Sequence, residues 1–304
     1  MTDAAPTRPR TDLPTRMLGR TGQAVPILGL GTGPGGMGLT DEAAVDLYAR
    51  ALDLGVTYVD TAPGYARAHL QVGRVMRRRR GEVFLATKVP CDSAVDLLSG
   101  LERGLDDLGT DGVDLAYIHH LGGRNVDQVL SPSGSLAGLL EARSRGWTRF
   151  VGFTAHNLPA AAARILTEAR VDVIMVALNF ADRHTYDFEG RVLPLAAAQG
   201  VGVAAMKVFG GAEAMKYETA PGEGSRRSAM EAAGFSDGEL ALRYALGLPG
   251  VALAVVGMYS PAELERNVAW ARRFRPLGPP EAAVLEDEGR RLAGLWGPHF
   301  GEVG

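Results

Sequence analysis

The sequence has 304 residues, of which 46% are hydrophobic and 22% are charged, and its formal net charge is −3. This balance is typical of a globular protein with a core, and the slight negative charge argues against a nucleic-acid or anionic-membrane binder, since either needs a basic surface. Cys91 is the only cysteine, which excludes a disulfide framework, a cysteine-rich zinc site and an iron–sulfur cluster.

The N-terminal segment, residues 1–15, is rich in Pro, Thr, Arg and Asp and lacks the apolar stretch of a signal peptide. We predict that it forms a disordered tail. The longest apolar run, Ala245 to Tyr259, is interrupted by Pro249-Gly250 and is short of a membrane span. These features favour a cytoplasmic protein that binds neither membranes nor nucleic acid.

From residue 27 onward, eight short β-rich runs alternate with longer stretches of helical period. The predicted strands are Ile27–Thr32, Val56–Asp60, Val83–Lys88, Val113–His119, Arg149–Phe153, Val171–Ala177, Val201–Met206 and Val251–Val256. The predicted helices are Asp41–Leu54, His69–Arg80, Ala94–Leu108, Ser135–Gly146, Pro159–Ala169, Asp187–Gln199, Ser236–Leu248 and Pro261–Arg273. Strands that are apolar throughout indicate a covered parallel sheet. Eight repeats without a linker predict one α/β domain over residues 16–304, a closed (β/α)8 TIM barrel.

Two further segments frame this barrel. Arg16–Leu18 and Ala24–Ile27 flank Gly19–Gly22, a pattern that predicts a β-hairpin across the bottom of the barrel. The longest connection, Val208 to Phe235, is rich in Gly and charge, and long loops of this kind are usually functional.

The walls of a substrate pocket are expected from this long connection, from the loop His120–Ser135 and from the tail Trp296–Phe300. Trp296, His299 and Phe300 would either close over the mouth of the barrel or pack against its outside.

A glycine motif suggests a competing fold. Gly31 to Gly36 matches G-x-G-x-x-G after a strand, and Asp60 ends the next strand, as in a Rossmann dinucleotide site. A pyrophosphate, however, needs bare amide groups at a helix start, whereas this helix begins at Thr40 and carries Asp41 and Glu42 in its first turn. Because these carboxylates would repel phosphate, we interpret the motif as a flexible loop at the barrel mouth.

Polar residues stand at or just beyond the carboxyl ends of strands two to four, which face the active-site mouth of such a barrel. They are Asp60, Tyr65, Lys88 and His119. Singly, each has an ordinary structural explanation: a turn cap, a loop aromatic, a snorkelling lysine and a core histidine. Together they favour a site, because a lysine ending an apolar strand needs a partner and Asp60 on the adjacent strand would supply one.

This set suits the reduction of a carbonyl group. A tyrosine hydroxyl holds its proton too tightly at neutral pH to exchange it efficiently, but a nearby ammonium favours the phenolate. Asp60 would hold the ammonium of Lys88, Tyr65 would protonate the substrate oxygen, and His119 would orient it by donating a hydrogen bond.

The order and context of these residues, Asp-Thr-Ala-x-x-Tyr, Ala-Thr-Lys and Ile-His, resemble the catalytic tetrad of the aldo-keto reductases. Leu18 to Gly22 with Val25 to Gly33 is similar to that family's hairpin and first strand, and Ala241 to Tyr244 with Gly257 to Asn267 is similar to its last helices. The similarity covers about residues 16 to 293 and fits a divergent branch that includes sugar dehydrogenases. It implies an NAD(P)(H)-dependent oxidoreductase that acts on an aldehyde, ketone or sugar, as a monomer or small homo-oligomer without a metal or iron–sulfur cluster.

The resemblance also implies where NADP or NAD binds. The expected cofactor-binding residues are Gly31, Thr32, Asp60, Thr154, His156, Asn157, Asn179, Met206, Lys207, Phe209, Gly257, Met258, Tyr259, Glu263, Arg266 and Asn267.

Several of these positions depart from the family's usual residues. Ala155 stands where an Asn is usual, Met175 replaces a Gln, and Met206-Lys207 replaces an aromatic-Ser pair, so that Lys207 would face the pyrophosphate. Glu263 would repel a 2′-phosphate, which favours NAD, although Arg266 could offset that effect. These departures leave two alternatives open: a cofactor-binding regulatory protein, or a lyase or epimerase that reuses the acid–base residues.

Overall fold

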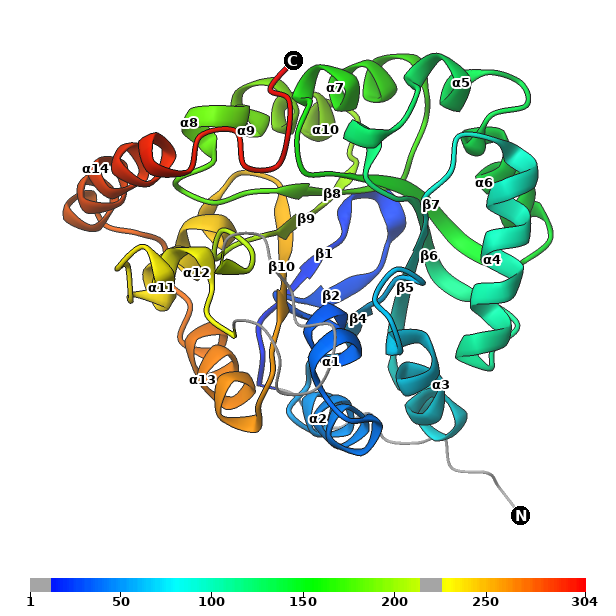
Figure 1. The fold of residues 1–304 in the computed structure, drawn as a ribbon, viewed down its shortest axis with the longest axis horizontal. Coiled ribbons are helices and arrows are strands. Elements are labelled where there is room, and N and C mark those ends of the chain that lie inside the picture. The colour runs from blue at the N-terminus through cyan, green and yellow to red at the C-terminus, as the bar shows by residue number, and fades with distance from the viewer. Residues whose placement is uncertain (1–11, 214–225) are drawn as a thin grey trace.

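The computed structural model describes residues 12–213 and 226–304 and shows a ring of helices around a central barrel (Figure 1). All eight barrel strands are parallel, and they close in the order β10-β3-β4-β5-β6-β7-β8-β9. Their bounds are β3 (Leu28–Gly31), β4 (Tyr58–Asp60), β5 (Phe84–Val89), β6 (Val113–Ile118), β7 (Thr148–Ala155), β8 (Val173–Ala177), β9 (Gly202–Met206) and β10 (Val251–Gly257). The predicted (β/α)8 barrel is confirmed, and every predicted strand overlaps an observed one.

Helices cover the outside of the barrel, as the continuous apolar character of the strands requires. They are α2 (Asp41–Asp53), α3 (Ala68–Arg79), α4 (Ala94–Leu108), α5 (Val126–Leu130), α6 (Ser135–Ser144), α7 (Pro159–Glu168), α12 (Gly238–Gly247), α13 (Pro261–Arg272) and α14 (Pro279–Trp296). The 18-residue helix α14 was not predicted; it packs against α8 (Arg183–Tyr186) and α12, outside the repeating units. None of the helices in the described ranges is both long and apolar enough to cross a bilayer.

One predicted helix is not continuous in the structure. The segment Asp187–Gln199 forms the short helices α9 (Phe188–Arg191) and α10 (Leu193–Ala198), and α8 precedes them. Pro194 stands in the first turn of α10, where its missing N–H costs nothing, but inside a continuous helix it would remove a hydrogen bond. The proline therefore splits the predicted helix.

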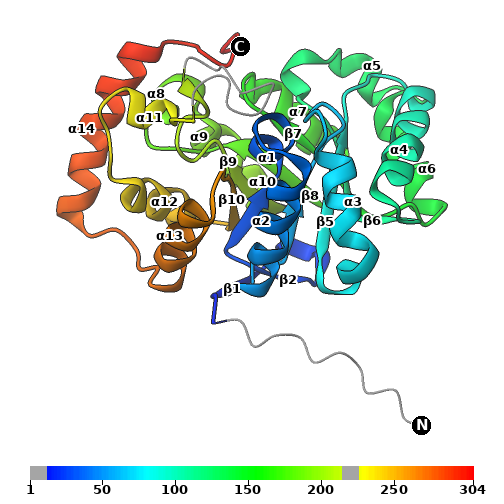
Figure 2. The ribbon, with the colours of Figure 1, turned by 60° about the horizontal axis from the view of Figure 1, so that its bottom comes forward.

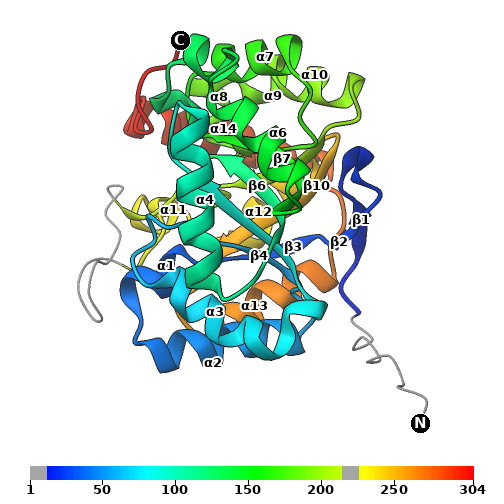
Figure 3. The ribbon, with the colours of Figure 1, turned by 90° about the vertical axis from the view of Figure 1, so that its right-hand side faces the viewer.

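The predicted hairpin is present as β1 (Thr15–Met17) and β2 (Ala24–Pro26), and it lies at the end of the barrel opposite α1 (Gly33–Gly38) and α11 (Ala229–Ala232) (Figures 2 and 3). Its Leu18 is buried among the side chains that fill the barrel, so the bottom is closed. The segment expected to be a tail is ordered in part: residues 1–11 lie outside the described residues, but Leu13 is buried and Thr15 pairs with Pro26. The described fold therefore begins before residue 16.

Candidate active site

The carboxyl ends of β4 and β5 bring Asp60 and Lys88 together inside the mouth of the barrel. Lys88 Nζ donates to Asp60 Oδ2 at 2.5 Å, to the Thr61 carbonyl at 3.0 Å and to the Tyr65 hydroxyl at 3.3 Å. The side chains of Lys88 and Asp60 are only 1% and 4% exposed. An ammonium has three protons to donate, and here each has an acceptor, which is the condition for keeping the charge buried.

The electrostatics of this pair favour the charged lysine. Burial works against the ammonium, but the combined attraction of Asp60 and Tyr65 outweighs it and raises the pKa of Lys88. Burial likewise pushes the pKa of Asp60 upward, and the adjacent Lys88 opposes that shift. With the cation in direct contact, the ion pair Asp60⁻–Lys88⁺ is the state that accounts for all three hydrogen bonds.

Tyr65 reaches the pair from the loop that follows β4. This loop rests on α1: the amide of Arg67 donates to the Gly36 carbonyl, and a Cβ on Gly36 would lie 2.1 Å from the Tyr65 carbonyl oxygen and 2.6 Å from Ala68 Cβ. Only a residue without a side chain allows this approach. The glycine motif was expected to form a flexible loop, but from Gly33 onward it is a short helix, in which the missing side chain of Gly36 lets the loop of Tyr65 lie close.

His119 follows β6 and completes the predicted quartet. Its ring centroid lies 6.0 Å from that of Tyr65, in an edge-on arrangement. Burial, with a further contribution from Lys88, lowers the pKa of His119 to about 3. The imidazole is therefore neutral at physiological pH and carries one N–H that can be donated to a substrate oxygen. The structure thus brings all four predicted catalytic residues into one mouth.

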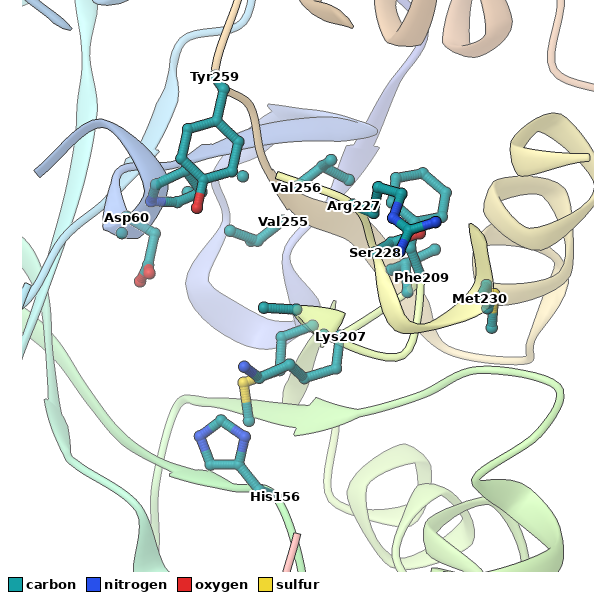
Figure 4. Close-up of a pocket in the computed structure, with 18 of the residues that line it drawn as sticks. Asp60, His156, Lys207, Phe209, Arg227, Ser228, Met230, Val255, Val256 and Tyr259 are labelled. Carbon is teal, nitrogen blue, oxygen red and sulfur yellow. The ribbon is translucent and has the colours of Figure 1, made fainter. Parts of the chain in front are cut away.

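Asp60, Tyr65 and His119 line a cavity of about 820 Å³, which falls within the size range of ligand sites. Eleven residues expected at a dinucleotide line it: Gly31, Asp60, His156, Met206, Lys207, Phe209, Gly257, Tyr259, Glu263, Arg266 and Asn267. Figure 4 labels five of them, Asp60, His156, Lys207, Phe209 and Tyr259, and shows Lys207 beside His156 and away from Tyr259.

The other five expected residues do not line the cavity. Thr32, Thr154, Asn157, Asn179 and Met258 are all buried, and their side chains have other partners or pack in the core. The Thr32 hydroxyl donates to the Asp60 carbonyl, and the Thr154 hydroxyl accepts from the amide of His120. Met258 is part of the main hydrophobic core.

The two asparagines, Asn157 and Asn179, form hydrogen bonds with other parts of the chain. Asn157 Nδ2 donates to the Glu302 carbonyl at 3.1 Å. Asn179 Nδ2 donates to Asp182 and to the Lys207 carbonyl, while its Oδ1 accepts from the amides of Ala181 and Asp182. Both amide groups therefore hold loops in place at the rim of the mouth, and the expectation that they face the cofactor is not met in this structure.

Several lining residues were missed by sequence reasoning. Arg226 and Arg227 precede α11, Trp270 lies on α13, and Arg124 follows β6. The paired arginines at 226 and 227, inside the long glycine-rich connection, were an available signal for an anion. Trp270 gave no signal of a binding site, because an aromatic residue on the last repeating helix is explained equally well by packing in the core.

The C-terminal tail closes over the mouth rather than packing on the outside. His299 and Phe300 line the cavity, with ring centroids 4.0 Å apart, and Trp296 stacks on His299 at 5.0 Å. His299 Nε2 lies 2.9 Å from Asp182 Oδ1, which ties the tail to the loop after β8.

A dinucleotide fits the residues at the other end of the cavity. Asn267 is 3% exposed, and its Oδ1 makes no hydrogen bond with the described residues, so a ligand that donates an N–H would relieve the cost of burying it. Gly257 allows the end of β10 to lie close to Pro34 on α1, because a Cβ at position 257 would lie 2.5 Å from Pro34 Cγ. Within the described ranges, no group of three or more potential metal ligands occurs.

Comparison with known proteins identifies the family of the chain. Residues 27–281 match the model of the aldo/keto reductase family. L-galactose dehydrogenase from Arabidopsis thaliana is 26% identical, over 91% of this chain and 94% of that protein, and pyridoxal 4-dehydrogenase from Microbacterium luteolum is 26% identical, over 86% and 94%.

Among solved structures, an aldo-keto reductase from Pseudomonas aeruginosa is 28% identical and superposes with a TM-score of 0.68, over 88% of this chain and 99% of that one. The chain therefore belongs to the aldo/keto reductase family of NAD(P)H-dependent oxidoreductases.

Proposed function

We propose that this protein interconverts a carbonyl compound and an alcohol with NADP(H) as the hydride carrier and Tyr65 as the acid and base. The observation that supports this most directly is the contact of Lys88 Nζ with the Tyr65 hydroxyl at 3.3 Å, because Lys88 is itself held by Asp60. A fixed cation beside a phenol favours the phenolate and so eases transfer of its proton at neutral pH.

When bound, the nicotinamide supplies or accepts the hydride at the substrate carbon. The chain's own residues handle the oxygen. Tyr65 gives its proton to the oxygen during reduction and takes it back during oxidation, while the neutral imidazole of His119 donates a hydrogen bond that orients the oxygen. Asp60 and Lys88 act through Tyr65, and their own burial keeps water from competing for the ion pair.

The residues proposed to hold the dinucleotide lie on β10, α13 and the long connection after β9. Asn267 would accept from the adenine amino group. Arg226 and Arg266 lie over the rings of Tyr259 and Trp270, at 5.5 and 5.4 Å, and would attract the phosphates.

The sequence favoured NAD because of Glu263, but this carboxylate accepts a hydrogen bond of 2.7 Å from the Tyr259 amide. Because the Tyr259 amide holds Glu263, and because Arg226 and Arg266 can attract a 2′-phosphate, we propose a preference for NADP(H).

The experiment is replacement of Tyr65 by Phe, followed by nicotinamide absorbance with a panel of aldehydes, ketones and sugars. We expect kcat/KM to fall by about 10²–10⁴-fold, the usual contribution of a general acid–base group, with little change in dinucleotide affinity. Tyr244→Phe is the matched control, because Tyr244 lies outside the cavity and donates to Glu189 on α9. Equal turnover by the Tyr65 variant and the native enzyme would remove the acid–base role.

A further inference from the structure

Asp182 is a buried carboxylate that the proposed reaction does not use. It follows β8, is 2% exposed and is not among the residues that line the cavity, so it is set back from any substrate or dinucleotide bound there. A carboxylate is costly to bury unless hydrogen-bond donors surround it. Asp182 has a donor on each oxygen, and these two donors belong to or contact two different segments of the cavity wall.

One oxygen of Asp182 is connected to the loop after β9. Asn179 Nδ2 donates to Asp182 Oδ2 at 2.6 Å and to the Lys207 carbonyl at 3.0 Å. Asn179 is itself fixed, because its Oδ1 accepts from the amides of Ala181 and Asp182. Lys207 has a φ of +57°, in the left-handed region that residues with a side chain rarely adopt, and such strain persists where the surrounding structure imposes it. The hydrogen bond from Asn179 therefore helps to hold the backbone of Lys207.

The other oxygen of Asp182 is connected to the C-terminal tail. Asp182 Oδ1 lies 2.9 Å from His299 Nε2, and a carboxylate oxygen there accepts the N–H of the ring. The ring of His299 stacks on Trp296 and on Phe300, with centroids 5.0 and 4.0 Å apart. Because the two rings are in contact, fixing the imidazole also restricts how the ring of Phe300 faces the cavity.

The two connections meet again at the cavity. Lys207 Nζ lies 5.9 Å from the ring centroid of Phe300, so the contacts form a closed circuit that begins and ends at Asp182. Lys207, His299 and Phe300 all line the cavity, and we call these three residues the tail-side wall. Asp182 is thus a single buried group to which both parts of this wall are linked.

The tail-side wall stands at the catalytic end of the cavity. The ring centroid of Phe300 lies 5.9 Å from that of His156. His156 lies 5.0 Å from His120, which follows His119 in the sequence, and Figure 4 shows Lys207 beside His156. Because the same cavity of about 820 Å³ has to hold a dinucleotide as well as a substrate, the position of this wall limits the size of the substrate.

We propose that Asp182 is a positioning residue that holds the tail-side wall in place before the substrate binds, so that the wall selects substrates by their bulk. Its two hydrogen bonds keep Lys207 and Phe300 in one arrangement, and an aldehyde or ketone has to fit between them and Tyr65. The favoured substrate is therefore compact on the side away from its carbonyl group. This inference rests on the proposed function, since it concerns the substrate of the same site.

The first test compares benzaldehyde with 4-tert-butylbenzaldehyde, which differ in bulk far from the reacting carbon. The ratio of their kcat/KM values does not depend on the amount of folded enzyme, so a loss of stability alone leaves it unchanged. The native enzyme is expected to favour benzaldehyde by about tenfold or more, since even one additional methylene group in a fitted pocket has an effect of that order. Asp182→Ala should reduce this preference to about threefold or less, because Asn179 and His299 then both lose their acceptor.

Asp182→Asn is the conservative variant and should keep most of the preference. Its side-chain oxygen can accept from Asn179, and its side-chain N–H can donate to His299 Nε2 when the imidazole takes its other tautomer. Asp127→Asn, at an exposed side chain of α5, is the matched control and should leave the preference as it is. Equal kcat/KM for the two aldehydes in the native enzyme would overturn the proposal, and so would an Asp182→Ala variant that lowers both values by the same factor.

If Asp182→Ala does not fold, two variants of His299 take its place. Glutamine can donate an N–H to Asp182 as the imidazole does, whereas leucine cannot, and neither side chain is a ring. His299→Gln should therefore keep more of the preference for benzaldehyde than His299→Leu. Equal preferences in these two variants would show that the hydrogen bond to Asp182 does not position the wall, and would overturn the proposal.

Fluorine NMR separates this inference from the proposed reaction. The ligand-free protein is labelled with fluorotryptophan, and the resonance of Trp296, one of three tryptophans, is assigned with Trp296→Phe. Asp182→Ala should shift and broaden this resonance, because the His299 ring that stacks on Trp296 loses its acceptor, while the resonance of Trp147, before β7, should stay unchanged. An unchanged Trp296 resonance would overturn the positioning role. A response of this resonance in a protein that reduces no carbonyl compound would support the positioning role and overturn only the proposed function.

Discussion

The two ends of the cavity are built in different ways. At the catalytic end, Lys88 has three acceptors, lies within the barrel and is almost wholly shielded from solvent. At the dinucleotide end, exposed arginines lie over aromatic rings on a loop and a helix, as Arg226 does over Tyr259. The difference implies that the proposed catalytic residues contribute to the stability of the barrel, whereas the proposed dinucleotide-binding residues contribute mainly to affinity.

The largest effect is expected from Lys88→Met, which leaves the buried carboxylate of Asp60 without its cation. Breaking a buried ion pair from one side costs about 3–5 kcal/mol, so the free energy of unfolding should fall by that amount. Chemical denaturation of the ligand-free protein measures it. Arg266→Gln, at the other end, should change the same quantity by no more than about 0.5 kcal/mol. Similar losses of unfolding free energy in the Lys88 and Arg266 variants would contradict the difference between the two ends of the cavity.

The catalytic end should also make stability depend on pH. His69, behind Lys88, is 3% exposed, and burial, aided by the charge of Lys88, lowers its pKa from 6.5 to about 4. Between those values the unfolded chain binds a proton that the folded chain does not, so this stability is present above pH 6.5 and is lost as the pH falls toward 4.

One such histidine changes the free energy of unfolding by about 1.4 kcal/mol per pH unit in that window. His69→Gln should therefore flatten the profile between pH 5 and pH 6, and His184→Gln, on the partly exposed helix α8, should flatten it much less. Identical slopes in the native protein and the His69 variant would show that this imidazole titrates normally in the fold.

At the dinucleotide end, Asn267→Leu should separate affinity from stability. Its Oδ1 is buried without a hydrogen bond to the described residues, so its removal should not lower the free energy of unfolding. The lost hydrogen bond to adenine is worth about 1 kcal/mol, which raises the Kd for NADP⁺ by about fivefold in a fluorescence titration. A variant that is less stable but binds NADP⁺ normally would indicate a structural role for Asn267.

The smallest effect is expected from Arg226→Gln. Because Arg226 is exposed, its attraction for a phosphate is screened, and the preference for NADP⁺ over NAD⁺ should fall by only about two- to fivefold. Measuring both Kd values at low and high salt tests this, since the native preference should shrink with salt and the variant's should not. A preference that is the same in both proteins would place the 2′-phosphate elsewhere.

The sequence predicted the barrel and the meeting of Asp60, Tyr65, Lys88 and His119 at its mouth because both follow from local signals. Unbroken apolar runs predict covered parallel strands, and a residue at the carboxyl end of a strand lies at the mouth of the barrel. The position of Lys88 after Phe84–Thr87 is enough to infer a buried partner. Helix α14 lies outside the strand–helix repeats, and the split at Pro194 was signalled by the proline but not by the helical period on which the prediction relied.

Sequence reasoning was less reliable for the dinucleotide site because residue type does not reveal which way a side chain faces. Thr154 and Asn179 have suitable donors, yet one accepts from the His120 amide and the other donates to the Lys207 carbonyl. Lys207 was expected at the pyrophosphate, but its Nζ lies 5.9 Å from the ring centroid of Phe300, on the side of His156 (Figure 4). Such choices depend on tertiary hydrogen bonds between segments far apart in the chain.

The close approach between Gly36 and the loop of Tyr65 has a practical consequence for engineering. A library that varies residues 31–36 to retune cofactor binding would also move Tyr65, the proposed general acid, because its carbonyl oxygen lies 2.1 Å from where the Cβ of a side chain at position 36 would be. Mutants at this position would score as inactive in a screen although the residue is outside the cavity lining. Library design on this barrel should therefore hold position 36 fixed and place its diversity on the far side of the mouth.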